Sequence, residues 1–118
     1  MLRDQLKSKI HRAIITGADT AYEGSIEIPL DLMLAVDLWE REKVLVASIS
    51  TGARLETYVQ VGKEGSGEIV MNGGAAHRIR AGERVTIMAF ARAEEPVPCL
   101  IALCDEENRI VRLEEKGS

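Results

Sequence analysis

The chain has 118 residues, of which 46% are hydrophobic and 29% are charged, so it is long enough for one modest core and is not intrinsically disordered. A net charge of −4 and few aromatic residues argue against a nucleic-acid partner. The segment Met1–Lys7 lacks the apolar run of a signal peptide, and no stretch approaches the length of a membrane span. These features predict a single domain, residues 1–118, that resides in the cytoplasm and contacts no membrane.

The first strand predicted along the chain carries side chains that are useful in chemistry. Residues 7–16 alternate, which puts Lys9, His11, Ala13 and Ile15 on one face and Ile10 on the other. A turn follows at residues 17–19, and residues 25–28 are typical of a second strand.

One segment has helical rather than alternating spacing. Its apolar residues recur along one helical face, and Pro29 is acceptable in a first turn, so we expect a helix over residues 29–40. The remaining strands are expected at 44–50, 55–61, 68–71, 84–91, 99–103 and 109–113, with a helical turn near 75–77 and a loose tail at 114–118. The pattern predicts a mainly β fold, a small β-barrel with one or two short helices.

The cysteines and histidines do not form a recognisable metal-binding set. Cys99 and Cys104 lie five residues apart on one predicted strand, so they point to opposite faces and are not expected to form a disulfide. Both are interpreted as small buried hydrophobic residues. Only His11 and His77 are available as further ligands, so no metal site is predicted.

The dipeptide Gly24-Ser25 stands where the second strand begins. A serine hydroxyl beside a glycine carbonyl can attack that carbonyl and convert the peptide into an ester. Elimination from the ester breaks the chain, and hydrolysis leaves a pyruvoyl group on the new N-terminus. Gly-Ser is also an ordinary turn dipeptide, so a cleavage site is indicated only if other segments of the chain supply the residues that such chemistry needs.

Lys9, Arg54 and Tyr58 are candidates for holding and protonating an anionic ligand. Arg54 and Tyr58 are four residues apart on a predicted strand and therefore share a face. A guanidinium can grip a carboxylate with two hydrogen bonds, and a neighbouring phenol can deliver a proton. The ordinary alternatives are a solvent-facing Lys9 and an exposed Arg54 packed on the Tyr58 ring.

The segment Asn72-Gly73-Gly74-Ala75-Ala76 lets a ligand approach the backbone closely. Successive N–H groups in such a turn can hold an anion, and an asparagine amide can hydrogen-bond a carbonyl or an oxyanion. An Asn-Gly turn without a ligand is the alternative interpretation.

Four blocks of the sequence, in this order and at these spacings, resemble the pyruvoyl-dependent aspartate 1-decarboxylase family. They are Lys9-Ile10-His11-Arg12, Tyr22-Glu23-Gly24-Ser25, Gly52-Ala53-Arg54 with Thr57-Tyr58, and Asn72-Gly73-Gly74-Ala75-Ala76-His77. The resemblance runs from about residue 1 to residue 92 and fades beyond Ala93. One departure is Gly74, where the family usually has alanine.

The resemblance implies a precursor that cuts itself between Gly24 and Ser25 into a short chain, 1–24, and a longer chain, 25–118. Ser25 becomes a covalent pyruvoyl cofactor, which forms a Schiff base with L-aspartate and leads to β-alanine and CO2. The implied fold is a double-psi β-barrel, assembled as a homotetramer with active sites between subunits. The product supplies pantothenate biosynthesis. Whether maturation needs a helper protein is left open.

The resemblance also assigns roles to individual residues. Ser25 and Tyr58 are the catalytic residues, with Tyr58 as proton donor, while Lys9 and Arg54 bind the two substrate carboxylates in an order that stays open. The other substrate-binding residues are Thr57, which also serves self-cleavage, Asn72, Gly73, Gly74 and Ala75. His11 either assists processing or is a neutral structural histidine. The alternative function is a non-catalytic β-barrel that binds a ligand or partner, with the Gly24-Ser25 bond intact.

Overall fold

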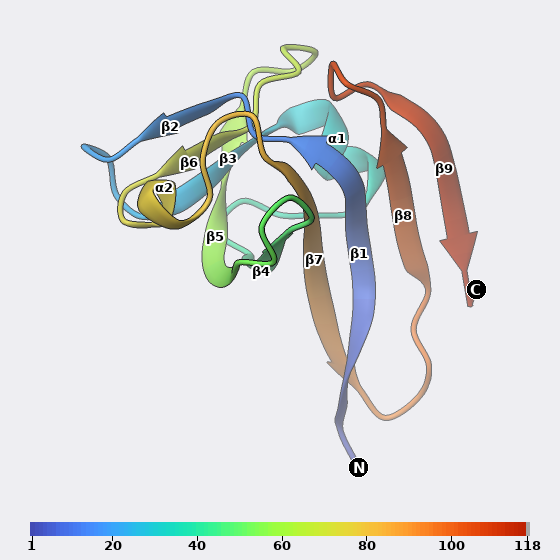
Figure 1. Ribbon diagram of the computed structural model, residues 1–118. Helices are drawn as coiled ribbons and strands as arrows, with labels where there is room; N and C mark the ends of the chain where they lie inside the picture. The colour runs from blue at the N-terminus through green and yellow to red at the C-terminus, as the bar shows by residue number, and fades with distance from the viewer. Residues whose placement is uncertain (118) are drawn as a thin grey trace.

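The computed structural model describes residues 1–117, which form nine strands and two short helices (Figure 1). In chain order the elements are β1 (Arg3–Ile14), β2 (Gly17–Asp19), β3 (Ser25–Pro29), α1 (Leu30–Ala35), β4 (Lys43–Ser48), β5 (Arg54–Gly62), β6 (Val70–Asn72), α2 (Ala75–Arg78), β7 (Arg84–Ala93), β8 (Cys99–Cys104) and β9 (Ile110–Lys116). The prediction of a mainly β fold with one or two short helices is confirmed. The double-psi connectivity stays a prediction.

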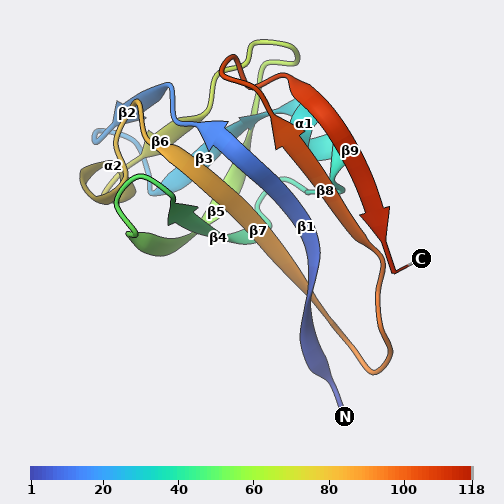
Figure 2. The ribbon, with the colours of Figure 1, turned by 45° about the vertical axis from the view of Figure 1, so that its right-hand side comes forward.

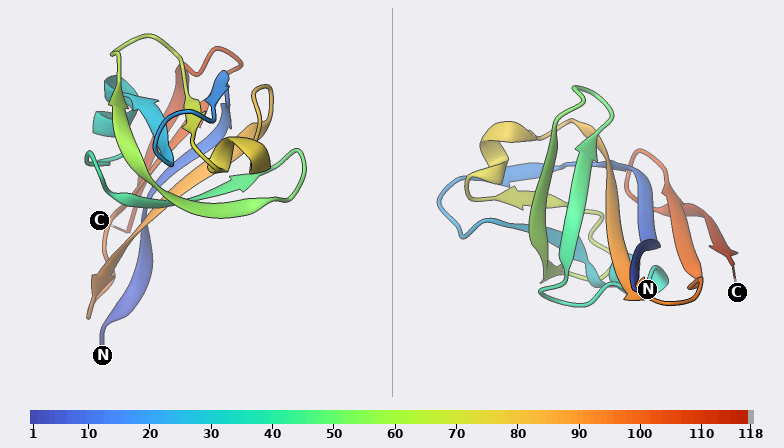
Figure 3. Two further views of the ribbon diagram at one scale, coloured as in Figure 1. Left: turned by 90° about the vertical axis from the view of Figure 1, so that its left-hand side faces the viewer. Right: turned by 90° about the horizontal axis from the view of Figure 1, so that it is seen from below.

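The strands follow one another in the order β2-β6-β3-β5-β4-β7-β1-β8-β9 and curl around a shared apolar core (Figure 3). The inward side chains are mostly β-branched, which suits a pleated, buried surface. Fully buried examples are Ile10, Ile26, Ile28, Val46 and Ile87. Burial of such side chains supplies the main favourable term for folding.

A β-bulge in β1 interrupts the alternation that the sequence predicts. Ile10 lies opposite Ile87 and Ala13 lies opposite Val85, so β1 has one residue more than β7 over this stretch. Arg12 lies at the bulge and adopts a left-handed conformation, with a φ of 62°. The prediction that Ala13 shares a face with Lys9 is therefore wrong, because the bulge turns Ala13 into the core beside Ile10.

Helix α1 is much shorter than the predicted span of 29–40. It ends because Asp37 adopts a left-handed conformation, with φ of 58°. The Leu38 N–H then donates to the Met33 carbonyl at 2.8 Å and the Asp37 N–H to the Leu34 carbonyl at 3.4 Å, which is the Schellman pattern of helix termination. Aspartate tolerates the left-handed region better than most residues, and Leu38 is buried as a result.

The Lys7 side chain binds the backbone that follows α1. Its ammonium donates to the Asp37 carbonyl at 2.6 Å and to Ser8 Oγ at 2.8 Å, and it lies 3.2 Å from the Glu42 carboxylate. The Lys7 and Glu42 side chains are only 18% and 23% exposed. Ser8, fully buried, donates to the Val36 carbonyl. This cluster joins β1 to the end of α1.

Replacing Lys7 with methionine is expected to lower the free energy of unfolding by about 1–3 kcal/mol, because the Asp37 carbonyl, the partly buried Glu42 carboxylate and the buried Ser8 hydroxyl lose their donor. Urea denaturation followed by circular dichroism measures the change. Lys43→Met is the matched control: Lys43 pairs with Glu56 at 3.1 Å where both side chains are exposed. That pair is expected to contribute about 0–1 kcal/mol. Equal losses in the two variants would contradict the role of Lys7.

The C-terminal hairpin of β8 and β9 extends the sheet beyond β1 (Figure 2). Strand β8 runs parallel to β1, with Ser8 opposite Leu100, and antiparallel to β9. Residues 114–116 pair with 99–101, so the prediction of a loose tail is wrong for them, because backbone hydrogen bonds of the ladder hold them. Ser118, the last residue of that predicted tail, lies outside the described residues.

The two cysteines are free thiols, as expected from their spacing. Cys104 is buried, and burial together with the nearby Asp105 charge raises the pKa of its thiol to about 11. Cys99 is only half-buried, so the prediction that both cysteines lie in the core is wrong for Cys99.

Candidate active site

Ser25 is the first residue of β3 and lies between β5 and β6. It stands opposite Asn72 in the antiparallel ladder with β6. In the parallel ladder with β5, Ile26 pairs with Val59, which puts Ser25 beside Tyr58. Three segments that are far apart in the sequence thus meet at the Gly24-Ser25 bond.

Hydrogen bonds hold the Ser25 hydroxyl in a buried position. The Asn72 amide donates to Ser25 Oγ at 3.2 Å, and the hydroxyl donates to the Glu23 carbonyl at 3.2 Å. Ser25 is fully buried and Asn72 is 4% exposed. The hydroxyl is therefore fixed beside the backbone of the residues that precede it.

Gly73 makes room for the segment before Ser25. A Cβ at this position would lie 2.6 Å from Gly24 Cα and N and 2.9 Å from the Tyr22 carbonyl oxygen. The φ of Gly73 is +70°, which side chains other than glycine rarely adopt, and its N–H donates to the Asp19 carbonyl at 2.8 Å. Glycine is therefore required here because the backbone of the Gly24 segment packs directly against it.

The two residues after Gly73 have different surroundings. Gly74 is exposed, and a Cβ added there would meet nothing within 4 Å. Ala75 is half-buried and begins α2. The alanine that the family usually has at position 74 would fit this chain without a clash.

Tyr58 points its hydroxyl at the side chain of Glu23, with 3.3 Å between Tyr58 OH and Glu23 Oε2. Burial, the negative charge of Glu23 and this hydrogen bond all raise the pKa of Tyr58 above its ordinary value of 10.0. Tyr58 is therefore protonated at neutral pH. The sequence pattern assigns Glu23 no role, and the only signal for one is its place next to Gly24.

Lys9, Arg54 and Tyr58 share the outer face of the sheet. Residues paired across neighbouring strands point to the same side. One such row crosses four strands through Lys9, Met88, Leu45 and Glu56. Arg54 and Tyr58 flank Glu56 on the same face of β5, because they lie two residues before and after it. Thr57 is half-buried and lies on the opposite face of β5.

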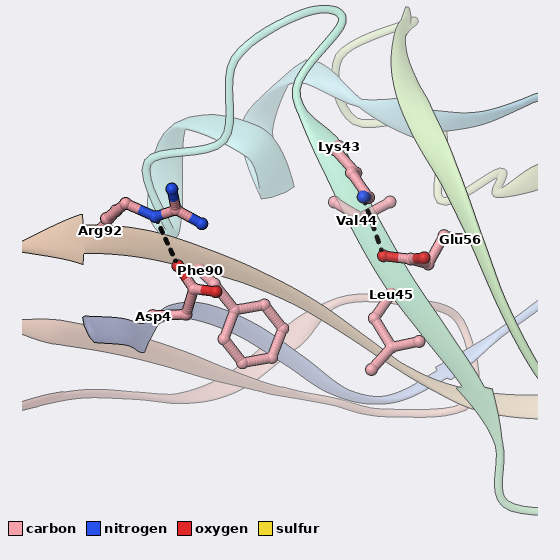
Figure 4. A pocket seen from close by; sticks show the side chains of 7 residues that line it. All are labelled: Asp4, Lys43, Val44, Leu45, Glu56, Phe90 and Arg92. Atoms are coloured by element: carbon pink, nitrogen blue, oxygen red, sulfur yellow. Dashed lines mark hydrogen bonds and ion pairs between the residues drawn. The ribbon is translucent and has the colours of Figure 1, made fainter. Parts of the chain in front are cut away.

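The outer face carries partly exposed apolar side chains and a pocket of about 300 Å³ (Figure 4). Phe90, which is 46% exposed, stands in this pocket between two ion pairs. The pairs are Arg92 with Asp4 and Lys43 with Glu56, each at 3.1 Å. A second hollow beside the pocket is lined by Lys43, Glu56, Thr57 and Tyr58. The pocket therefore continues toward Tyr58.

Lys9 and Arg54 do not contact Ser25 within the described part of the chain. Three strands lie between β1, which carries Lys9, and β3. Arg54 lies on β5, which pairs with β3, but four residues before Tyr58, or about 13 Å along the strand from the position beside Ser25. No hydrogen bond or ion pair between described residues joins Lys9 or Arg54 to the Ser25 segment. The fold thus brings together Gly24, Ser25, Tyr58, Asn72 and Gly73, and puts the two cations elsewhere on the outer face.

His11 is half-buried, with Nδ1 3.2 Å from Thr86 Oγ1. Burial and then the positive charges of Lys9 and Arg12 lower the pKa of His11 below its ordinary value of 6.5. The imidazole is therefore neutral at pH 7 and is suited to a hydrogen bond with the Thr86 hydroxyl.

The lowered pKa of His11 predicts a loss of stability in acid. Between the unfolded value of 6.5 and the lower folded value, the unfolded chain binds more protons, so stability falls as the pH drops through this window. Urea denaturation at about pH 7 and about pH 5 is expected to show a smaller acid-dependent loss for His11→Gln than for the parent chain. His77→Gln, at an exposed histidine, is expected to keep the parent's loss. An unchanged loss in His11→Gln would contradict the assignment.

Within residues 1–117, no group of three or more His, Cys, Asp or Glu side chains is arranged to hold a metal ion. Over the same residues, neither helix is long and apolar enough to cross a membrane.

The chain matches the family model described as aspartate decarboxylase over residues 1–111, which extends beyond the region of motif resemblance. An aspartate 1-decarboxylase from Caldicellulosiruptor bescii is 46% identical, covering 98% of this chain and 94% of the relative. Another, from Myxococcus xanthus, is also 46% identical, covering 94% of this chain and 88% of the relative. A third, from Corynebacterium efficiens, is 50% identical, covering 96% of this chain and 86% of the relative. The match leaves the non-catalytic alternative without support, and the chain belongs to the aspartate decarboxylase family of enzymes.

Proposed function

We propose that the protein decarboxylates L-aspartate to β-alanine and CO2 with a pyruvoyl group that it makes from its own Ser25. Membership of the aspartate decarboxylase family supports the reaction. The observation that carries the cofactor assignment is the buried Ser25 hydroxyl, bound by Asn72 beside a Gly24 segment that only a glycine at position 73 accommodates.

Self-cleavage would begin with attack of Ser25 Oγ on the Gly24 carbonyl carbon. The C–N bond breaks, the nitrogen takes up the hydroxyl proton, and an ester joins Gly24 to the serine oxygen. Loss of the Ser25 Cα proton to a base then expels the Gly24 carboxylate with the electron pair of the Cβ–O bond. Addition of water to the resulting dehydroalanine, after tautomerisation, releases ammonia and leaves the pyruvoyl group.

The residues around Ser25 fit such a group. Asn72, whose amide already reaches Ser25 Oγ, would hold it. The turn at Gly73, Gly74 and Ala75 would bind the substrate, with the N–H groups of Gly74 and Ala75 as donors, because the Gly73 N–H already donates to the Asp19 carbonyl. When present, the pyruvoyl ketone supplies an electron sink for the electron pair left when CO2 departs. Holding the reactants in position can lower the barrier by roughly 7–11 kcal/mol.

The remaining assigned residues would bind and protonate the substrate. Arg54 and Lys9 would each bind one aspartate carboxylate, and Tyr58 would return a proton to the substrate carbon. The phenol suits this role because even its ordinary pKa of 10.0 keeps Tyr58 protonated at neutral pH. Thr57 would assist substrate binding and self-cleavage. His11 would assist the processing of the precursor.

We infer a homotetramer with active sites between subunits. Lys9 lies on the outer face, separated from the Ser25 strand of its own chain by three strands, so a second copy is a ready source of the missing cation. The partly exposed Leu45, Met88 and Phe90 on the same face are suited to burial in such an interface. The β-alanine would serve cytoplasmic pantothenate biosynthesis.

The direct test is intact-mass analysis combined with a β-alanine assay. Purified protein incubated to completion is expected to give a fragment ending at Gly24 and a fragment beginning with a pyruvoyl group at position 25. Only this cut form is expected to convert aspartate. Full activity in a chain that keeps an unmodified Ser25 would contradict the proposal.

A further inference from the structure

Tyr58 is not free in the uncut chain. Its hydroxyl donates to the carboxylate of Glu23 at 3.3 Å, and Glu23 stands one residue before the bond that is proposed to break. The other charged groups near this contact lie on β4 and β5, where Lys43 pairs with Glu56 and neither side chain bonds Tyr58. Glu23 therefore holds the group that the proposed reaction needs as its proton donor.

Breaking the Gly24-Ser25 bond changes the position of Glu23 in two ways. Glu23 passes from a tethered position inside the chain to the residue before a chain end. The cut also creates a carboxylate on Gly24, the residue that follows Glu23 in the chain. Negative charges on neighbouring residues repel each other. The same cut that makes the cofactor thus weakens the only hydrogen bond that the Tyr58 hydroxyl makes among the described residues.

We propose that Glu23 is a positioning residue that holds the Tyr58 hydroxyl in the uncut chain and releases it when the Gly24-Ser25 bond is broken. The inference rests on the proposed function, since it takes the cut and the role of Tyr58 from it. Glu23 itself touches no reacting atom of the substrate in this account. Its effect is to couple the availability of the proton donor to the appearance of the cofactor.

The titration of Tyr58 tests the contact in the uncut chain. The protein has only two tyrosines, so a chain labelled with ¹³C at tyrosine Cζ gives two signals, and Tyr22→Phe assigns them. In the uncleavable Ser25→Ala chain, the pKa of Tyr58 is expected to lie above its ordinary value of 10.0. Glu23→Gln in this background is expected to lower the pKa of Tyr58.

Glu56→Gln is the matched control, because Glu56 lies two residues from Tyr58 on the same face of β5 but does not bond it. In the Ser25→Ala background, Glu56→Gln is expected to change the pKa of Tyr58 less than Glu23→Gln does. An unchanged titration in Glu23→Gln, or an equal shift in Glu56→Gln, would overturn the contact.

The cut protein tests the release. After complete cleavage of the unsubstituted chain, the pKa of Tyr58 is expected to fall below its value in the Ser25→Ala chain and to be insensitive to Glu23→Gln. A Tyr58 that still responds to Glu23→Gln after the cut would overturn the release. A chain that never cuts would contradict the proposed function and the release with it, while the uncut titration still decides whether Glu23 holds Tyr58.

Discussion

Replacing Gly73 with alanine is expected to slow self-cleavage by at least about 100-fold, the effect of misplacing reacting groups by about 1 Å. The new Cβ would lie 2.6 Å from two backbone atoms of Gly24, so the segment before the scissile bond has to move. The left-handed φ of +70° adds strain of about 1–3 kcal/mol. The rate is measured by denaturing gels and intact mass over time.

Gly74→Ala provides the control for this prediction. The neighbouring position has open space around its Cβ direction, so the same chemical change is expected to leave cleavage within about threefold of the parent rate, a difference under 1 kcal/mol in the barrier. Thermal denaturation of both variants separates a local effect from unfolding. Normal cleavage in a folded Gly73→Ala chain would show that Gly24 does not need this packing.

Ser25→Ala is expected to abolish both cleavage and β-alanine formation, because it removes the attacking oxygen and the source of the pyruvoyl carbonyl. The fold is expected to survive. The substitution leaves the buried Asn72 amide without its Ser25 acceptor, which costs about 1–3 kcal/mol of stability. Intact mass, a β-alanine assay and circular dichroism together distinguish lost chemistry from lost structure.

Ser8→Ala is a useful comparison for Ser25→Ala. Ser8 is also fully buried and hydrogen-bonded, but it serves the end of α1 rather than the cleavage segment. This variant is expected to lose a similar amount of stability and to cut normally at equal folded fraction. Two fragments from a Ser25→Ala chain would remove Ser25 as the nucleophile.

Local chemistry could be predicted from the sequence because it depends on covalent neighbours. Gly24 and Ser25 are adjacent, the Asn72-Gly73 turn has a strong local preference, and alternation over β5 predicts that Arg54 and Tyr58 share a face. The order and spacing of these motifs also indicated the family. None of these inferences needs a contact between distant parts of the chain.

Predictions failed where one residue or one distant contact changes the outcome. The left-handed Asp37 ends α1 early, and the extra residue at Arg12 turns Ala13 into the core. A period of two cannot anticipate a bulge, because a single inserted residue reverses the face of every residue after it.

The amino-acid sequence by itself determined the mainly β class, the family and the serine that is proposed for self-cleavage. Only the tertiary structure decided that Gly73 packs against Gly24 and that Glu23 holds Tyr58, since strand pairing joins these segments across long stretches of chain. It also put Lys9 on the outer face, away from Ser25. The physical reason is that residue type fixes what a side chain can do, whereas backbone pairing fixes which partner it meets.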